Sequence, residues 1–416
     1  MNVKTAPSRS DADPVAEPSD RFRRKRDRIL DAAASIINER GLKGLTFVAV
    51  AEAVGLNTTS VTYYFKRKEL LAAAALERSV RQLGAMLDDA AREATPEARV
   101  RTLLRLYLEQ QGNVRLGRDR PMTLLSDLRA MEEPMRGQLL DSYGVELTKA
   151  INLFDPVPGD PLARARAHIL TDTLYWMRAW LPKYSVGDYE RIGRRVMDIF
   201  RHGILPDGTA FPVILSDPAE DETTTDEISR ETYLRAATRL INERGYRGAS
   251  VERIAAELKV SKGSFYHHLD GKDDLVLECF QRSYGRVSQA QRRAIDRDGT
   301  CRDRLAACMC ELLDVQFGQT YPLLRITALQ ALPTEVRLKV LARSDRMAMR
   351  FAGMLSDGIA ESTVRPVDPM IASQMVTGLI NSAYDMRNWA SQQGGRGRAI
   401  ELYAHPLAFG LFAPLG

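Results

Sequence analysis

The sequence predicts an all-α protein made of two tandem units. Apolar residues recur with the helical period along most of the chain, and no stretch shows the convincing alternation of a β-strand. The chain also repeats itself internally, at an offset of about 204 residues. Its 416 residues, 44% hydrophobic and 27% charged, have the composition of a soluble globular protein of two or more domains. This excludes a fibre, a wholly disordered chain and a small disulfide scaffold.

The repeat is visible at both ends of a unit of about 200 residues. Residues 37–41 (INERG) return as residues 241–245, and an ungapped comparison of 27–71 with 231–275 gives 13 identities in 45 positions. Far downstream, YWMRAW at 175–180 is echoed by YDMRNW at 384–389. The chain therefore carries a whole unit twice.

Each copy begins with a pattern of three short helices. The first ends at Gly41 or Gly245, where a left-handed C-cap favours glycine. Thr46 and Ser250 stand before the second helix as N-caps, and a short turn follows, at 55–57 in the first copy. Two short helices joined by a three- to four-residue turn form a helix-turn-helix.

The third helix of each copy is mostly polar, at 58–65 (TTSVTYYF) and 262–269 (KGSFYHHL). Only two apolar residues in each face a core, and Lys68 and Lys272 start the next helix. A helix of this kind enters the major groove of DNA while flanking groups contact phosphate. The sequence therefore predicts binding of double-stranded DNA. The alternative is a three-helix packing unit whose polar helix only faces solvent.

These motifs resemble the DNA-binding domain of the TetR (tetracycline-repressor-like) family. The resemblance covers about 45–50 residues per copy: a glycine after the first helix, a Thr- or Ser-capped second helix, an aromatic pair, and Lys-x-x-Leu. It implies an all-helical fold in which each helix-turn-helix domain is followed by a helical regulatory domain with a dimer interface and an inducer pocket. It also implies a transcriptional regulator, which we expect to be a repressor released by a small molecule.

The resemblance also assigns the DNA-binding residues. Phosphate contacts are implied for Thr46, Lys68, Ser250, Tyr266 and Lys272. Contacts with bases or DNA backbone are implied for Thr58, Thr59, Thr62, Tyr63, Lys262, Gly263, Ser264 and His267.

Three positions depart from the family pattern. Thr62 stands where a tyrosine is usual, Lys259 replaces the glycine that the first copy keeps as Gly55, and Leu269 replaces the usual phenylalanine. Two of the departures fall in the second copy, which leaves open a protein that senses small molecules or binds proteins, and whose second helix-turn-helix no longer reads DNA.

The expected organisation follows from these motifs, from the composition of the connecting segments and from the charge pattern. We expect a disordered tail at 1–20, DNA-binding domains at 21–72 and 227–276, regulatory and dimerisation domains at 73–204 and 277–416, and a linker at 205–226. Six basic residues and one acidic residue at 21–28 carry +5, equal to the net charge of the whole chain. We interpret this run as an arm for the minor groove or phosphates, or else as a solvated charge run.

Two helical stripes bear tryptophans in the regulatory regions. They are Leu162, Ala165, Ile169, Thr173, Trp176 and Trp180, and Ile371, Met375, Leu379, Ser382, Met386 and Trp389. Because the family forms dimers through its last long helices, we expect the stripes to pack together as an intramolecular pseudo-dimer. Packing inside each half is the alternative. The sequence leaves open whether two such chains also form a homodimer.

Other functions have weaker support. A small apolar effector fits the residues Tyr107, Met122, Met131, Met135, Tyr143, Phe317, Tyr321, Met347, Met349 and Met354, although such residues are more often ordinary core. His267 and His268 diverge on a helix, and Cys308-x-Cys310 has no second pair, so we expect no metal. No cofactor loop or catalytic motif is present, so we expect no enzyme, no cofactor, no membrane span and a cytoplasmic location.

Overall fold

The computed structural model describes residues 20–123, 131–215, 230–261, 263, 271–318, 322–325, 332 and 334–415. Within these ranges the chain is built from helices and turns and contains no β-strand, so the predicted fold class is confirmed. Residues 1–19 of the predicted tail lie outside the described residues, and Asp20 begins the first helix.

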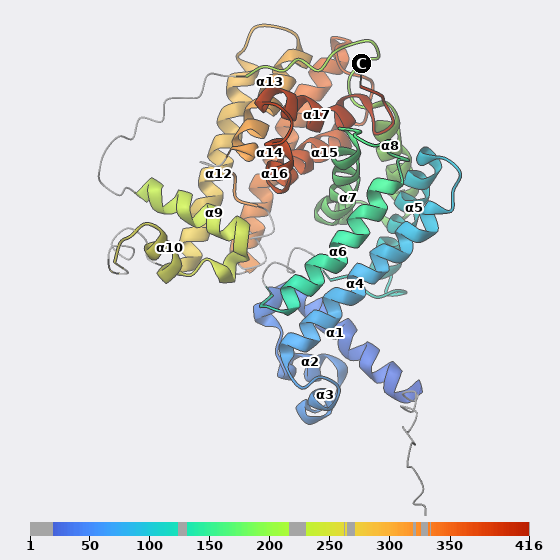
Figure 1. The fold of residues 1–416 in the computed structure, drawn as a ribbon, viewed down its shortest axis with the longest axis vertical. Coiled ribbons are helices and arrows are strands. Elements are labelled where there is room, and N and C mark those ends of the chain that lie inside the picture. The colour runs from blue at the N-terminus through green and yellow to red at the C-terminus, as the bar shows by residue number, and fades with distance from the viewer. Residues whose placement is uncertain are drawn as a thin grey trace, which may run out of the picture.

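The first unit consists of a head and a body. The first head contains α1 (Asp20–Gly44), α2 (Phe47–Val54) and α3 (Thr58–Tyr64). The body contains α4 (Lys68–Ala91), α5 (Pro96–Arg115), α6 (Met135–Asn152), α7 (Ala163–Trp180) and α8 (Tyr189–His202), with 3-10 turns at Leu181–Lys183 and Val186–Asp188. The long helix α4 joins the two parts, because it packs on α1 as well as on α5 and α6 (Figure 1).

The second unit follows the same order. Its head contains α9 (Arg230–Gly248) and α10 (Val251–Glu257), and its body contains α12 (Lys272–Ile295), α13 (Cys301–Phe317), α14 (Thr334–Ala360), α15 (Pro369–Ser382), α16 (Arg387–Ala390) and α17 (Arg396–Phe409). A 3-10 turn at Ala383–Met386 follows α15. In Figure 1 the first head lies at the bottom, the second head at the left, and the C-terminus at the top.

The two units meet along a seam between the bodies. Helices α7 and α8 pack on α15 and α17, and the indole N–H of Trp176 donates to Gln374 Oε1 at 3.2 Å. At the ends of α8 and α17 the contact is reciprocal. The N–H of Ile204 donates to Leu407 O at 3.1 Å, and the N–H of Leu411 donates to Phe200 O at 2.7 Å. Ile204 and Leu411 lie 207 residues apart, as do Phe200 and Leu407. The same two positions of each unit therefore make the contact, one as donor and one as acceptor.

The predicted linker begins as part of this seam. Leu205 and Phe211 are buried, and the N–H of Leu205 donates to Ala408 O at 2.9 Å. Residues 216–229, which include the rest of the predicted linker, lie outside the described residues.

The basic run 21–28 forms the first turns of α1, where Asp20 pairs with Arg23 and a carboxylate suits a helix N-terminus. One detail differs from the sequence-based expectations: the second tryptophan stripe is not one helix. Helix α15 ends at Ser382, and Trp389 packs against Tyr403 of its own unit.

Candidate nucleic-acid interface

Helix α3 presents a polar face at the tip of the first head. Val61 and Phe65 are buried in the core of the head, as predicted, whereas Thr58 and Thr59 are exposed and Tyr63 is 66% exposed. Thr62 is partly buried, and its hydroxyl donates to Thr59 O at 2.9 Å. The packing of the two apolar residues thus turns the remaining polar residues towards solvent.

Two caps hold this helix in place. Thr46 Oγ1 accepts the N–H of Ala49 at 3.1 Å and starts α2, and Asn57 Oδ1 accepts the N–H of Ser60 at 2.7 Å and starts α3. Between them Gly55 has a φ of 66°, which glycine adopts without steric cost. The Thr46 hydroxyl still has a proton to donate to a phosphate oxygen.

The start of α1 lies against α3, a contact that the sequence analysis missed. The ring of Phe22 lies 4.7 Å from that of Tyr64 and 6.1 Å from that of Tyr63, measured between centroids. Arg26 lies over the Phe65 ring at 5.2 Å, and Arg28 donates to Val54 O at 2.9 Å. The sequence feature that could have indicated this contact is Phe22, the one aromatic residue in the basic run 21–28.

The predicted phosphate-binding lysines occupy equivalent places. Lys68 is exposed and begins α4, and Lys272 begins α12. The first N–H groups of such helices also favour anions. Each lysine is therefore the first residue of the long helix that begins the body of its unit.

The second head is described in part. Ser250 Oγ accepts the N–H of Arg253 at 3.2 Å and caps α10 as predicted, and Gly263 is exposed. Lys259 holds a φ of 55°, where the first head has Gly55. The predicted site residues Lys262, Ser264, Tyr266 and His267 lie outside the described residues.

The first head also touches the second unit. Arg337 of α14 donates to the carbonyl of Glu39 in α1 at 2.7 Å. Glu39 also borders a groove of about 650 Å³ between α1 and α2, which is lined by charged and small side chains. The position of the first head therefore depends on α14 as well as on α4.

The second body encloses a small cavity. It lies between α12, α14, α15 and the segment 323–324, and it is lined by Ser283, Tyr284, Val287, Leu323, Leu324, Ser344, Met347, Phe351, Thr377, Ile380 and Asn381. Of the predicted effector-binding residues, Met347 lines this cavity, whereas Met349 is exposed. Tyr321 lies outside the described residues.

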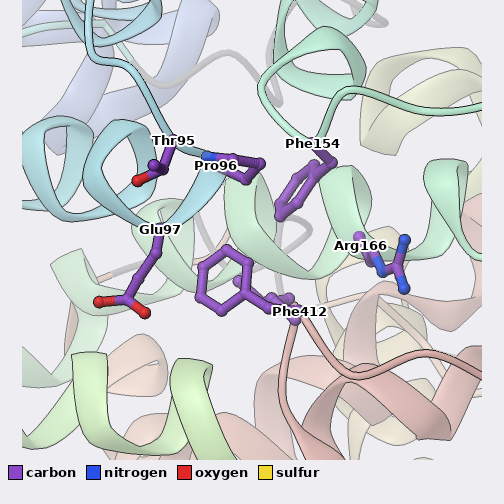
Figure 2. Close-up of a pocket in the computed structure, with 7 residues that line it drawn as sticks. Thr95, Pro96, Glu97, Phe154, Arg166 and Phe412 are labelled. Carbon is purple, nitrogen blue, oxygen red and sulfur yellow. The ribbon is translucent and has the colours of Figure 1, made fainter.

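A larger pocket of about 340 Å³ opens where the C-terminus meets the first body (Figure 2). Figure 2 shows Glu97 on one side and Arg166 on the other, with the rings of Phe154 and Phe412 between them. Arg166 binds Asp160 Oδ2 at 2.9 Å and Ala413 O at 2.7 Å. The hydrogen bond from Arg201 holds the pKa of Glu97 below its usual value. Beside this pocket, the bond from Arg166 to Ala413 connects the first body to the C-terminal segment of the second unit.

An ionisable group lies in the seam beside α15. The group is Asp172 of α7. A Cβ atom placed at Gly378 of α15 would lie 3.3 Å from Asp172 Oδ2, so α7 and α15 approach closely there. Loss of hydration raises the pKa of Asp172 to about 8, and the nearby Asp385 acts in the same direction. The Ser382 hydroxyl bonds this carboxyl group and opposes the shift.

Cys308 and Cys310 of α13 are buried thiols. Burial raises the pKa of both, that of Cys310 to about 11, so they remain protonated at neutral pH. Among the described residues, no group of three or more His, Cys, Asp or Glu side chains is placed to hold a metal ion. No helix in the described ranges is long and apolar enough to cross a membrane.

A polar helix exposed at the tip of a three-helix head, followed by a lysine at a helix start, defines a helix-turn-helix DNA-binding protein. Comparison with known families agrees. Residues 29–75 and 234–279 both match the family "Bacterial regulatory proteins, tetR family", and residues 298–399 match "Tetracyclin repressor-like, C-terminal domain". The chain belongs to the TetR family of transcriptional regulators and carries its DNA-binding domain twice.

Curated relatives match one part of the chain each. The fatty acid metabolism regulator protein of Bacillus subtilis is 25% identical over 149 residues, which are 35% of this chain and 76% of that protein. The regulator BetI of Brucella anthropi is 35% identical over 80 residues, 19% of this chain and 41% of that protein. The solved TetR-family regulator PfmR from Thermus thermophilus is 26% identical, with a TM-score of 0.34, and the match covers 42% of this chain and 93% of PfmR. The relatives are named as regulators.

Proposed function

We propose that this chain is a ligand-responsive repressor that binds one operator with both heads. The two bodies then form an intramolecular pseudo-dimer, which does in one polypeptide what relatives of the family do as pairs of chains. DNA is the macromolecular partner, a small apolar molecule is the effector, and no enzymatic step is required.

The reciprocal seam carries this proposal. In a two-fold contact, residue i of one partner binds residue j of the other, and j binds i. The bonds from Ile204 to Leu407 and from Leu411 to Phe200 have this relation, with equivalent positions exchanged between the units. An arrangement of this kind favours two heads that address two half-sites.

The operator is an imperfect palindrome in this proposal. The first reading helix has the sequence TTSVTYYF at 58–65, and the second has KGSFYHHL at 262–269, so the two half-sites differ. Successive major grooves on one face of DNA are about 34–36 Å apart. Thr46, Thr58, Thr59, Thr62, Tyr63 and Lys68 serve one half-site, and Ser250, Lys262, Gly263, Ser264, Tyr266, His267 and Lys272 serve the other.

Selection of bound sequences from random duplexes, followed by mass measurement of the complex, tests this proposal. We expect one 46.5 kDa chain per duplex and a site with two distinguishable halves. A perfectly symmetric site bound by two chains would show that each chain uses one head. Failure to bind any duplex at low ionic strength would refute DNA binding itself.

The effector is proposed to bind the cavity of the second body. Its walls combine apolar groups, such as Val287, Met347 and Phe351, with the hydroxyls of Ser344 and Thr377. This lining suits a mainly apolar molecule with a polar group. The name of the Bacillus subtilis relative makes fatty acids of increasing chain length a reasonable first panel. The midpoint temperature of thermal unfolding should be higher in the presence of each fatty acid that binds than in its absence.

One feature of the second head favours a second candidate function. A lysine in left-handed backbone conformation costs about 1 kcal/mol, and Lys259 occupies that conformation in the turn of the second helix-turn-helix. This observation favours a protein that binds DNA through the first head while the second unit senses a small molecule or a protein. The lysine substitutions described in the Discussion separate the two cases.

A further inference from the structure

Two side chains, one from the second head and one from the second body, hold the segment between α13 and α14. Asn242 of α9 donates to Leu323 O at 2.9 Å and accepts the N–H of Arg325 at 2.9 Å. Ser283 of α12 accepts the N–H of Leu324 at 2.8 Å. Asn242 and Ser283 are both buried. We call these two residues, with the segment 323–325 that they hold, the second latch.

The first unit has the same arrangement at equivalent positions. Asn38 of α1 donates to Met122 O at 2.8 Å, and Ser79 of α4 accepts the N–H of Thr123 at 2.7 Å. Asn38 lies 204 residues before Asn242, and Ser79 lies 204 residues before Ser283. The duplicated asparagine of the INERG repeat thus makes the same bond from each head to its body.

The second latch forms one wall of the cavity of the second body. Ser283, Leu323 and Leu324 belong to the latch and also line the cavity. The other walls are faces of α12, α14 and α15, whose backbones are held by helical hydrogen bonds. The segment 322–325 is not helical and is held through side chains, among them Gln316, whose Oε1 accepts the N–H of Leu323 at 3.0 Å.

The cavity is too small for an effector without movement of a wall. Its volume is about 20 Å³, which holds one water molecule. A larger occupant must push Leu323 and Leu324 outwards. Asn242 then either loses its bonds to the segment or moves with it, and α9 carries Asn242 only three residues before its kink at Gly245.

The packing of the second head makes it sensitive to such a movement. Leu240, Ile241 and Ile254 of this head belong to the same continuous core as the second body. By contrast, the first head has a core of its own. Among the described residues beyond α4, Met131 and Leu139 are buried in it, and Met135 and Tyr143 pack against it. A shift of the segment 323–325 is therefore passed to α9 and α10 through packing as well as through Asn242.

We propose that Asn242 and Ser283 are positioning residues that couple the cavity of the second body to the second head. Occupation of the cavity displaces the segment 323–325 and loosens α9 and α10, the two described helices of the second head. This inference rests on the proposed effector function and specifies its regulation: the second unit is the half that responds, through the latch. A ligand shifts the protein only if it favours the displaced form.

The test replaces the unknown effector by a larger side chain inside the cavity. Val287→Phe places a ring against Leu323 and Leu324, and Ser344→Leu fills the cavity from α14 if the first variant does not fold. Asn242→Ala opens the latch directly. Hydrogen exchange of the backbone amides of Arg230–Glu257 is measured by mass spectrometry for each variant and for the double variant.

We expect Val287→Phe and Asn242→Ala each to speed exchange in α9 and α10 by about tenfold. The double variant should show no further increase, because both changes act through the same contact. Asn38→Ala is the matched control: it should speed exchange in α1 and leave α9 unchanged. Both cavity-filling variants should leave α1 at the wild-type rate.

Two results would overturn the inference. One is a folded Val287→Phe or Ser344→Leu variant with wild-type exchange in α9, and the other is fully additive effects in the double variant. Either result leaves the proposed function intact if the protein still binds DNA. Conversely, a wild-type protein that binds no duplex refutes the proposed function, whatever the exchange experiment shows.

Discussion

A Cβ atom at Gly410 would lie 2.4 Å from the carbonyl oxygen of Arg201 in the other unit. The equivalent glycine of the first unit has the same restriction, because a Cβ atom at Gly203 would lie 2.1 Å from Ala408 O. Both glycines have positive φ, 100° and 67°. The ends of α8 and α17 can therefore cross as closely as they do only because neither residue has a side chain.

This relationship predicts that Gly410→Ala weakens the seam. The methyl group must displace backbone, and a positive φ is costly for alanine, so the free energy of unfolding should fall by more than about 3 kcal/mol. Gly208→Ala is the matched control, since Gly208 has a φ of 73° but nothing within 4 Å of its Cβ position. It should cost about 1–2 kcal/mol. Urea unfolding of both variants measures the difference, and equal losses would show that the crossing is not tight.

Asp172 makes the stability of the seam depend on pH. Its folded pKa, about 8, lies above the ordinary value of 3.8, so between these values the unfolded chain loses a proton that the folded protein keeps. The contribution of this group to stability is complete below about pH 4 and is lost as the pH rises towards 8.

The substitution Asp172→Asn tests this dependence. The amide keeps the shape without the titration, so it should stabilise the protein at pH 8 by at least about 1.4 kcal/mol and have little effect at pH 4. The difference in the free energy of unfolding between variant and wild type is measured across this range. A difference that does not change with pH would contradict the raised pKa.

The two lysines at helix starts should reveal how many heads bind DNA. Lys68→Ala should reduce the slope of log K against log salt concentration by about one, because one phosphate contact is lost. If both heads bind, Lys272→Ala should have the same effect. Arg194→Ala is the control, since Arg194 lies on α8 and pairs with Glu190.

Fluorescence anisotropy with a labelled operator gives these slopes. An unchanged slope for Lys272→Ala, with a reduced slope for Lys68→Ala, would support the alternative in which only the first head reads DNA. Unchanged slopes for both would remove the phosphate-binding role of either lysine.

Arg166 should hold the C-terminal segment on the first body. Its guanidinium group binds Asp160 and the carbonyl of Ala413, and both charged side chains are largely buried. Arg166→Ala leaves Asp160 without its ion-pair partner, so we expect a loss of about 3–5 kcal/mol and faster proteolysis after Phe409. The neighbouring Arg164 is exposed, and Arg164→Ala should change stability by less than about 0.5 kcal/mol. Equal proteolysis of both variants would contradict this role.

Local sequence patterns predicted the structural features that depend only on residues close together in the chain. Thr46 and Ser250 cap their helices, Gly41 and Gly245 have positive φ, and Val61 faces the core of the first head. Each of these features depends on residues within one or two helical turns. The same is true of the exposed position of Tyr63.

Contacts between distant segments could not be predicted in this way. No local pattern indicated which residues Phe22 and Asn242 would contact, because the pairs Phe22–Tyr64 and Asn242–Leu323 depend on how separate segments dock. The tryptophan stripes show the same limit. Trp176 does reach across to Gln374, but Trp389 packs against Tyr403 in its own unit, because α15 ends before it.

The sequence by itself determined that the chain is helical, that it is duplicated and that each copy begins with a helix-turn-helix, since periodicity, capping and internal identity are properties of short segments. Only the tertiary structure decided how the copies meet. The crossing at Gly203 and Gly410 joins the copies, and the bonds from Asn38 to Met122 and from Asn242 to Leu323 join each head to its body, in every case between residues far apart along the chain. Such contacts are selected by shape and by the pairing of buried polar groups, which no short stretch of sequence encodes.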